Sequence, residues 1–237
     1  MQAKYGFASE RNREAQMNKI VPLDSTSNVP GVRPAGQKRS RLLQDRFVIA
    51  GRKILIETRL KDVSIPTLAA KAGSSVGGFY SRFDSKEVYF NFMRSQMFEE
   101  HTILHDQYLD PAKFQTKTHK SVSIAFVDLM LEMVSGPWRG VLREAFLSVP
   151  DDPEGWGPMK HRSEHLCDRL LKLYEPLVEN KKVLDQRVTF AVQLVISAVD
   201  TASVNSNLKF GISDLEFRDY LIESFNALIT GNFQTAT

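Results

Sequence analysis

An all-α fold is predicted by three features of this sequence. Apolar residues recur at intervals of three and four along most of the chain, which is the spacing of one helix face. No segment alternates apolar and polar residues as a half-buried strand does. Proline and glycine interrupt the helical patterns at Pro111, Gly136-Pro137 and Gly211, where helices are expected to end. An apolar content of 42% over 237 residues supports a packed core.

The first 38 residues differ from the rest in composition. They include PLDSTSNVPGVRPAGQ, which shows neither a helical nor a strand period, so we expect a disordered arm over residues 1–38. The arm lacks the apolar run of a secretory signal, and no stretch of the chain approaches the roughly 18 apolar residues of a membrane span. The single cysteine, Cys167, fits a reducing compartment. We therefore expect a cytoplasmic protein without membrane contact.

Three helices are predicted in the first half of the chain. Residues 41–59 carry an apolar stripe at helical spacing. Ser64 is a suitable N-cap for a short helix over residues 65–71, and Gly73 ends it. A third short helix is expected over residues 76–82.

The remaining helices carry their own boundary signals. Asp84 with Glu87, and Ser213 with Glu216, resemble capping boxes, and Gly231 is a stop signal. These helices are predicted over residues 84–105, 119–135, 137–148, 156–178, 184–206 and 214–230.

The charge is unevenly distributed along the chain. Residues 33–94 hold 13 Lys/Arg and 5 Asp/Glu, a net charge of +8, whereas residues 95–237 hold 14 and 20, a net charge of −6. A basic segment followed by an acidic remainder indicates that one part binds a polyanion and the other has another role. The alternative is a solvated basic face.

The stretch AGSSVGGFYSRFDSKE, residues 72–87, has the composition of a helix-turn-helix. It lacks the glycine spacing of a phosphate loop or of a dinucleotide site. Two short helices that cross at a tight turn need a small residue at their contact, a turn glycine and apolar anchors, and Ala69, Gly73 and Phe79 meet these needs. The stretch therefore predicts a DNA-binding module rather than a phosphate-binding enzyme, the alternative being an ordinary helical hairpin.

The second helix of this motif has two faces. Val76, Phe79 and Phe83 are expected to point inward together. Small residues that face outward let a helix backbone approach base edges in the major groove, while tyrosine and lysine at its rim reach phosphates. The residues expected to face outward or lie at the rim are Gly77, Gly78, Ser81 and Tyr80.

A longer pattern surrounds this motif. It reads S-I-x-x-L-A-x-x-A-G-x-S and then G-x-F-Y-x-x-F-x-S-K-E over residues 64–87. In this pattern residues 41–90 resemble the DNA-binding domain of the tetracycline-repressor (TetR) family of bacterial regulators. Ser74 stands where the family usually has an aliphatic residue, and Gly78 where Ser or Thr is common.

The resemblance implies both an architecture and a set of contacts. It implies a helix-turn-helix domain over residues 39–90, then a helical domain over residues 91–237 that binds an effector and dimerises. It further implies a regulator, most simply a repressor, that binds a palindromic operator in double-stranded DNA as a homodimer. The implied DNA contacts are Ser64, Thr67, Ser75, Val76, Gly77, Gly78, Tyr80, Ser81 and Lys86.

The C-terminal part offers apolar residues for both of its expected roles. In the family the last two long helices usually form the dimer, and here they carry apolar stripes. The expected interface residues are Phe190, Leu194, Ala198, Ala202, Phe217, Leu221, Phe225 and Leu228. A lining for a hydrophobic or aromatic small molecule is offered by Phe126, Met130, Met133, Trp138, Phe146, Met159, Leu170 and Tyr174. For both sets the alternative is the chain's own core.

The sequence gives only weak evidence for a metal site or for catalysis. His101/His105 and His161/His165 are spaced as i, i+4 pairs, which a metal site could use, but solvated or core histidines explain them as well. We expect no metal, no cofactor and no enzymatic activity. The alternative function is a helical small-molecule or metal-binding protein, conceivably an enzyme, whose helix-turn-helix no longer binds DNA.

Overall fold

A computed structural model confirms the all-α fold for the residues that it describes, which are Met17, 29–34, 38–114, 117–148, 157–179 and 181–231. Only the backbone is described for residues 157–162. The chain forms two compact units: unit 1 extends to Glu100 and includes Gly136–Ser148, and unit 2 holds His101–Ser135 and residues 149–237. The predicted domain limits, 39–90 and 91–237, remain predictions.

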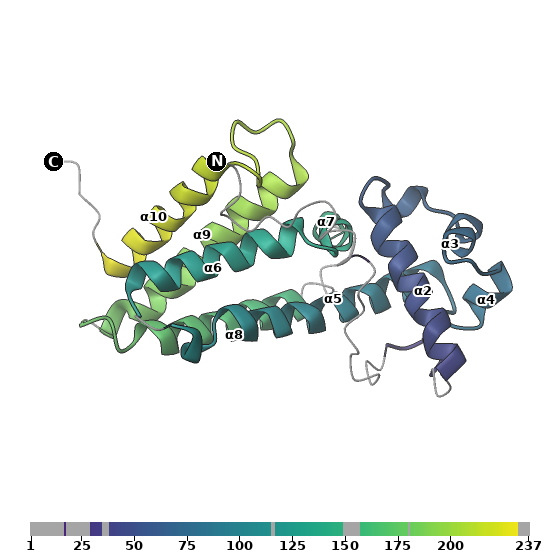
Figure 1. The fold of residues 1–237 in the computed structure, drawn as a ribbon, viewed down its shortest axis with the longest axis horizontal. Coiled ribbons are helices and arrows are strands. Elements are labelled where there is room, and N and C mark those ends of the chain that lie inside the picture. Colours follow the sequence, from purple (N-terminus) through teal and green to yellow (C-terminus); the bar gives the residue numbers. More distant parts are fainter. Residues whose placement is uncertain are drawn as a thin grey trace. The chain divides into compact units, whose positions relative to one another are not determined.

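Unit 1 contains the predicted short helices (Figure 1). Within it α2 packs against α3 and α7, and α3 packs against α4. A long helix, α5, continues from this unit into unit 2. The bounds are α2 Lys38–Leu55, η1 Leu60–Asp62, α3 Ile65–Lys71, α4 Val76–Tyr80, α5 Lys86–Tyr108 and α7 Arg139–Leu147.

An aromatic cluster forms the core of unit 1. Phe47 of α2 lies edge-on to Phe79 of α4, with ring centroids 5.5 Å apart, and edge-on to Phe83 at 6.0 Å. Tyr89 packs against the same two rings and donates its hydroxyl to the Phe47 carbonyl over 2.8 Å. Complete burial raises the pKa of Tyr89 well above its usual range, so the hydroxyl stays a donor. The cluster fixes α4 against α2, because Phe79 is wholly buried.

Residues 29–34 were predicted to belong to a disordered arm, but the structure gives them a defined conformation. Val32 forms an isolated antiparallel bridge with Phe83. Since β-bridges are set by long-range partners, the local composition of this segment did not reveal its position. Lys38, the last residue of the predicted arm, is instead the first residue of α2. The other arm residues, apart from Met17, lie outside the described residues.

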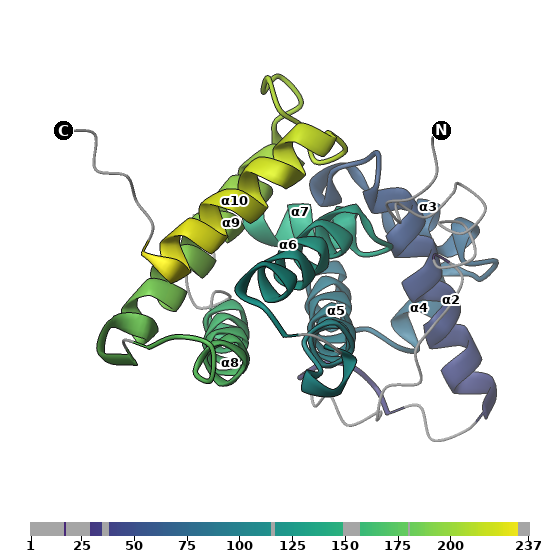
Figure 2. The same ribbon diagram turned by 60° about the vertical axis from the view of Figure 1, so that its left-hand side comes forward.

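Unit 2 is a layered bundle of helices. Its bounds are η2 Pro111–Lys113, α6 His119–Ser135, α8 Gly157–Tyr174, η4 Lys181–Val183, α9 Leu184–Val204 and α10 Leu215–Thr230. Helix α6 packs against α8, α9 and α10, and α9 packs against α8 and α10. Figures 1 and 2 both show α10 lying along α9. The predicted stop of α10 is confirmed, because Gly231 adopts a left-handed conformation with φ 75°.

One helical segment among the described residues, Lys181–Val204, is long and apolar enough to cross a membrane by length and composition. Val188, Val192, Val195 and Val199 of this segment are fully buried in the protein. Core helices of globular proteins share this length and composition, so the segment is weak evidence for a membrane span.

Candidate nucleic-acid interface

The first helix of the motif is capped as the sequence predicts. Ser64 precedes α3 in an extended conformation, and its hydroxyl accepts the Thr67 amide proton over 3.2 Å. The two hydroxyls of this pair lie 2.8 Å apart. Both residues are exposed, so their hydroxyls lie together at the start of α3, where helix N-termini favour anions.

The turn between α3 and α4 is a Schellman motif. Gly73 has φ 61°, which glycine adopts without strain. Its amide donates to the Ala70 carbonyl, and the Ser74 amide donates to the Ala69 carbonyl, the two bonds that define this C-cap. Arg46 of α2 donates to the Gly73 carbonyl over 3.1 Å. Sequence reasoning missed Arg46, because nothing in its local pattern reveals a partner 27 residues away.

Helix α4 holds together despite two adjacent glycines. The Ser75 hydroxyl caps its start by accepting the Gly78 amide proton over 3.0 Å. The Ser81 hydroxyl donates to the Gly78 carbonyl over 2.7 Å at the other end. These bonds and the burial of Phe79 offset the roughly 1 kcal/mol by which each glycine disfavours a helix relative to alanine.

Ser74 and Gly78, the two departures from the family pattern, lie next to each other. A Cβ at Gly78 would collide with the Ser74 hydroxyl oxygen. The usual hydrophobic contact of a Schellman motif involves the position that Ser74 occupies. The serine side chain instead lies in the space that a larger residue at position 78 would need, so the residues at positions 74 and 78 fit each other locally.

The exposed face of α4 is small and partly apolar. Val76 is 39% exposed, so its predicted inward orientation is wrong: the first residue of α4 stays accessible, although the buried Phe79 follows only three positions later. Gly77 is exposed, and a Cβ there would make only an ordinary contact, 3.8 Å from the Ser75 hydroxyl oxygen. Tyr80 is 45% exposed, and its ring lies edge-on to Phe79 with centroids 5.5 Å apart. The hydroxyl of Tyr80 is therefore carried on a ring held by the core.

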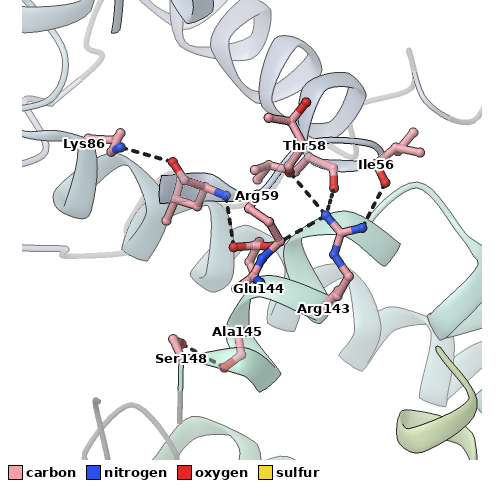
Figure 3. A network of polar contacts seen from close by, with 10 residues as sticks. Ile56, Thr58, Arg59, Lys86, Arg143, Glu144, Ala145 and Ser148 are labelled. Atoms are coloured by element: carbon pink, nitrogen blue, oxygen red, sulfur yellow. Dashed lines mark hydrogen bonds and ion pairs between the residues drawn. The ribbon is translucent and has the colours of Figure 1, made fainter. Parts of the chain in front are cut away.

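Lys86 has a structural partner that the sequence did not indicate. Its ammonium group donates to the carbonyls of Leu60 and Val63, each over 3.1 Å. Figure 3 shows Lys86 donating one bond to the loop that holds Arg59. These carbonyls flank the loop that enters α3, so Lys86 fixes the position of that helix. Its predicted contact with phosphate remains a prediction.

Helix α7 packs onto the end of α2 through a polar network (Figure 3). The Arg143 guanidinium donates to the carbonyls of Leu55, Ile56 and Thr58 over 2.8–3.2 Å. These carbonyls stand at and just after the C-terminus of α2, where helices leave acceptors unpaired. Gly140 allows the approach, because a Cβ there would lie 2.8 Å from the Ile56 nitrogen and closer still to the Leu55 carbonyl.

The neighbouring residue on α7 extends the network toward the helix-turn-helix. Glu144 is buried and accepts from the Arg59 Nε over 2.6 Å and from the Leu60 amide over 3.0 Å. The loop after α2 is therefore bonded to α7 on one side and to Lys86 on the other. Sequence reasoning placed α7 in the C-terminal domain and missed this contact, which joins residues about 85 apart.

A second buried charge lies in the same unit. Arg52 of α2 is buried, pairs with Glu100 over 2.7 Å and stacks 3.7 Å above the Trp138 ring. Burial lowers the pKa of Arg52, while the Glu100 carboxylate opposes this effect. The Trp138 indole donates to the same carboxylate over 2.9 Å. Trp138, predicted as an effector residue, therefore packs within unit 1, as does the half-buried Phe146.

The other predicted effector residues lie in unit 2 and are tightly packed. Phe126 contacts Phe225 with ring centroids 4.5 Å apart. The Tyr174 hydroxyl lies 2.9 Å from that of Ser123 in the core, and burial raises the Tyr174 pKa. The residues of this set that are almost fully buried are Phe126, Met130, Met133, Leu170 and Tyr174. The side chain of Met159 lies outside the described residues, and an effector-binding role stays a prediction for the whole set.

The predicted dimer residues separate into two groups. Phe225 and Leu221 of α10 and Ala202 of α9 are buried in this chain, which corrects the expectation that they contact a second chain. Phe225 packs against Phe126 of α6, with ring centroids 4.5 Å apart. The residues that keep an exposed or half-exposed face are Phe190, Leu194, Ala198, Phe217 and Leu228.

The histidine pairs do not form a recognisable metal centre. His101 and His105 are buried on α5, and the His105 ring stacks against His165 with centroids 6.4 Å apart. Across the described residues no group of three His, Cys, Asp or Glu side chains is placed to hold a metal ion. The His161 side chain lies outside that description.

Comparisons with known proteins found distant likenesses among solved structures. No protein-family model matches the chain, and no curated protein matches it. Among solved structures it is similar to the crystal structure of a TetR transcriptional regulator from Rhodococcus sp. RHA1. The two chains are 14% identical, the match covers 84% of this chain and 100% of the other, and the TM-score is 0.44. The likeness is too distant to carry an argument about function, which therefore rests on the chain's own residues.

Proposed function

We propose that this protein is a DNA-binding transcriptional regulator. The observation that carries the proposal is the turn at Gly73, which places a short helix with an exposed, low-profile face beside the capped start of α3. Gly77 and Val76 let the backbone of α4 approach base edges, and Tyr80 at the rim supplies a hydroxyl for a phosphate. The net charge of +8 over residues 33–94 suits a polyanionic partner.

Selection from a randomised duplex pool at physiological salt tests this proposal. The native protein should enrich one motif, with an affinity that falls steeply as salt rises. Tyr80→Phe, which removes only the hydroxyl, should weaken binding to all duplexes and leave the salt slope unchanged, because a neutral hydroxyl releases no counterions from the phosphates. Lys86→Ala is a poor test, because it also releases the loop before α3. Failure to enrich any sequence, with a flat salt dependence, would contradict the proposal.

We further propose that the regulator is a homodimer formed through α9 and α10. Phe190 is 55% exposed and Leu194 is 39% exposed on one face of α9, and Tyr220 is 60% exposed on α10. Adjacent helices with exposed apolar residues are typical of an interface between identical chains. Such a dimer would present two copies of α4 to half-sites one helical turn apart.

Sedimentation of variants that introduce a charge tests the dimer. Phe190→Glu and Leu194→Glu should produce monomers, since each buries a charge in an apolar interface. Leu208→Glu is the matched control, because Leu208 is 41% exposed but lies in the connection between α9 and α10. A native protein that sediments as a monomer, or equal effects of all three changes, would refute this interface.

The third part of the proposal is release of DNA by an apolar or aromatic effector, which makes the protein a repressor. A ligand can shift the DNA affinity only through its different affinities for two states of the protein. Arg143 and Glu144 of α7 bond to the segment between α2 and α3. A movement of α7 would therefore displace the helix-turn-helix. Compounds found by thermal-shift screening should lower DNA affinity, and Arg143→Met should reduce that coupling. A compound that binds tightly and leaves DNA affinity unchanged would argue against this mechanism.

A further inference from the structure

The segment Val29–Pro34 forms a strap over the turn that follows α4. It begins with a Pro30-Gly31 turn, in which the Val32 amide donates to the Val29 carbonyl over 3.1 Å. Gly31 has φ 85°, as the third residue of a type II turn requires, and proline is favoured at the second position. The turn thus gives the strap a fixed shape of its own.

Backbone bonds attach the strap to residues 82–84. The Arg33 amide donates to the Arg82 carbonyl over 2.9 Å, and the Asp84 amide donates to the Gly31 carbonyl over 3.1 Å. These two bonds enclose the bridge between Val32 and Phe83. Phe83 is wholly buried in the aromatic cluster, so the strap lies on the backbone of a core residue.

Side-chain contacts attach both ends of the strap to neighbouring elements. The Arg82 guanidinium donates to the Pro34 carbonyl over 3.3 Å and to the Ser40 hydroxyl at the start of α2. At the other end a Cβ on Gly31 would lie 2.9 Å from a methyl group of Val88. The strap therefore joins α2, the end of α4 and the start of α5.

Helix α4 is the element that needs such support. It has five residues, and Gly77 and Gly78 are two of them. Glycine is a poor helix former, and so short a helix has little stability of its own. Its N-terminus is fixed by Ser75 and the Schellman turn, while its C-terminus runs directly into the residues that the strap holds.

We propose that the strap is a positioning element that holds α4 in the orientation needed to recognise a DNA sequence. This inference rests on the proposed DNA-binding function and adds a determinant of specificity outside the helix-turn-helix. A positioning role differs from charge attraction: loss of the strap should weaken binding to the preferred duplex far more than binding to a scrambled one. Removing a basic side chain should weaken both alike.

The test compares Gly31→Ala with Arg33→Ala in the full chain. Alanine at position 31 disfavours the positive φ, and its Cβ would collide with the Val88 side chain. Gly31→Ala should therefore release the strap. Arg33→Ala is the matched control, because it keeps the backbone bonds and removes only an exposed pair with Asp84. Amide exchange without DNA should be about tenfold faster at Asp84 and Ser81 in Gly31→Ala alone. Affinity for the selected duplex should fall about tenfold, and for a scrambled duplex less than about twofold.

Each outcome decides between the alternatives. Faster exchange at Asp84 without a change at Ser81 would overturn the proposal, because α4 would then not depend on the strap. Equal losses on both duplexes would also overturn it, in favour of a charge contribution. If the native protein prefers no duplex, the proposed function fails, while the exchange result still decides whether the strap supports α4. If Gly31→Ala unfolds unit 2 as well, two truncated chains provide the same comparison. Deletion of residues 1–34 removes the strap, and deletion of residues 1–28 keeps it.

Discussion

Replacing Gly140 and Gly77 by alanine should change stability in opposite directions. Both glycines lie in helices, so alanine gains about 1 kcal/mol of helix propensity at either position. At Gly77 the nearest atom to a new Cβ is the Ser75 hydroxyl oxygen at 3.8 Å, an ordinary contact. Gly77→Ala should therefore stabilise the protein by about 0.5–1 kcal/mol.

Alanine at position 140 would instead collide with backbone atoms. The new Cβ would lie 2.8 Å from the Ile56 nitrogen and closer to the Leu55 carbonyl, and neither group can rotate away. Relieving the collision means moving α7 off the end of α2, which also weakens the Arg143 bonds to the carbonyls there. Overpacking of this kind costs about 1–3 kcal/mol or more. With the lost bonds included and the propensity gain subtracted, we expect a net loss of about 2 kcal/mol.

Urea unfolding followed by tryptophan fluorescence measures this difference. Trp138 is buried in unit 1, and Trp156→Phe in every variant makes it the only reporter. With a slope of about 2 kcal/mol per molar urea, Gly140→Ala should move the midpoint about 1 M lower, and Gly77→Ala should raise it slightly. Equal midpoint shifts for the two variants would refute the close approach of α7 to α2.

Four other outcomes are expected. Gly78→Ala should affect stability more favourably together with Ser74→Ala, which removes the hydroxyl beside the new Cβ; a double-mutant cycle in urea measures the coupling, and additive effects would contradict the contact. Lys86→Met should lower stability by about 1–2 kcal/mol without DNA, because loop carbonyls lose a charged donor, and an unchanged midpoint would contradict this. Arg218→Ala breaks a two-bond pair with a carboxylate of α6 at 2.6 and 2.9 Å, and calorimetry should show a loss of about 1–3 kcal/mol. Burial raises the pKa of the Cys167 thiol, so at pH 8 iodoacetamide should modify the folded chain more slowly than the urea-unfolded chain; equal rates would show that the thiol is not protected.

Several features of the molecule could be predicted from local sequence. The helix over residues 119–135 and the stop at Gly231 were predicted correctly, because apolar periodicity and capping residues act within a few positions. The cap at Ser64 was predicted for the same reason. The turn glycine, Gly73, was recognisable because a short helix followed by a second one leaves few residues able to take a positive φ there.

Other features depended on partners far along the chain. The Pro30-Gly31 turn is a local signal, but its attachment beside Phe83 joins residues 51 apart, so composition alone favoured disorder. The attachment of α7 to α2 depends on Gly140 lying against a carbonyl about 85 residues away. Apolar periodicity marks a buried helix face without naming what covers it, which is why Phe225 was assigned to a second chain and proved to contact Phe126. The sequence by itself thus determined most of the helices, the cap at Ser64 and the turn, but not the caps of α5 and α10. The tertiary structure decided which faces meet, because long-range packing leaves no trace in local spacing.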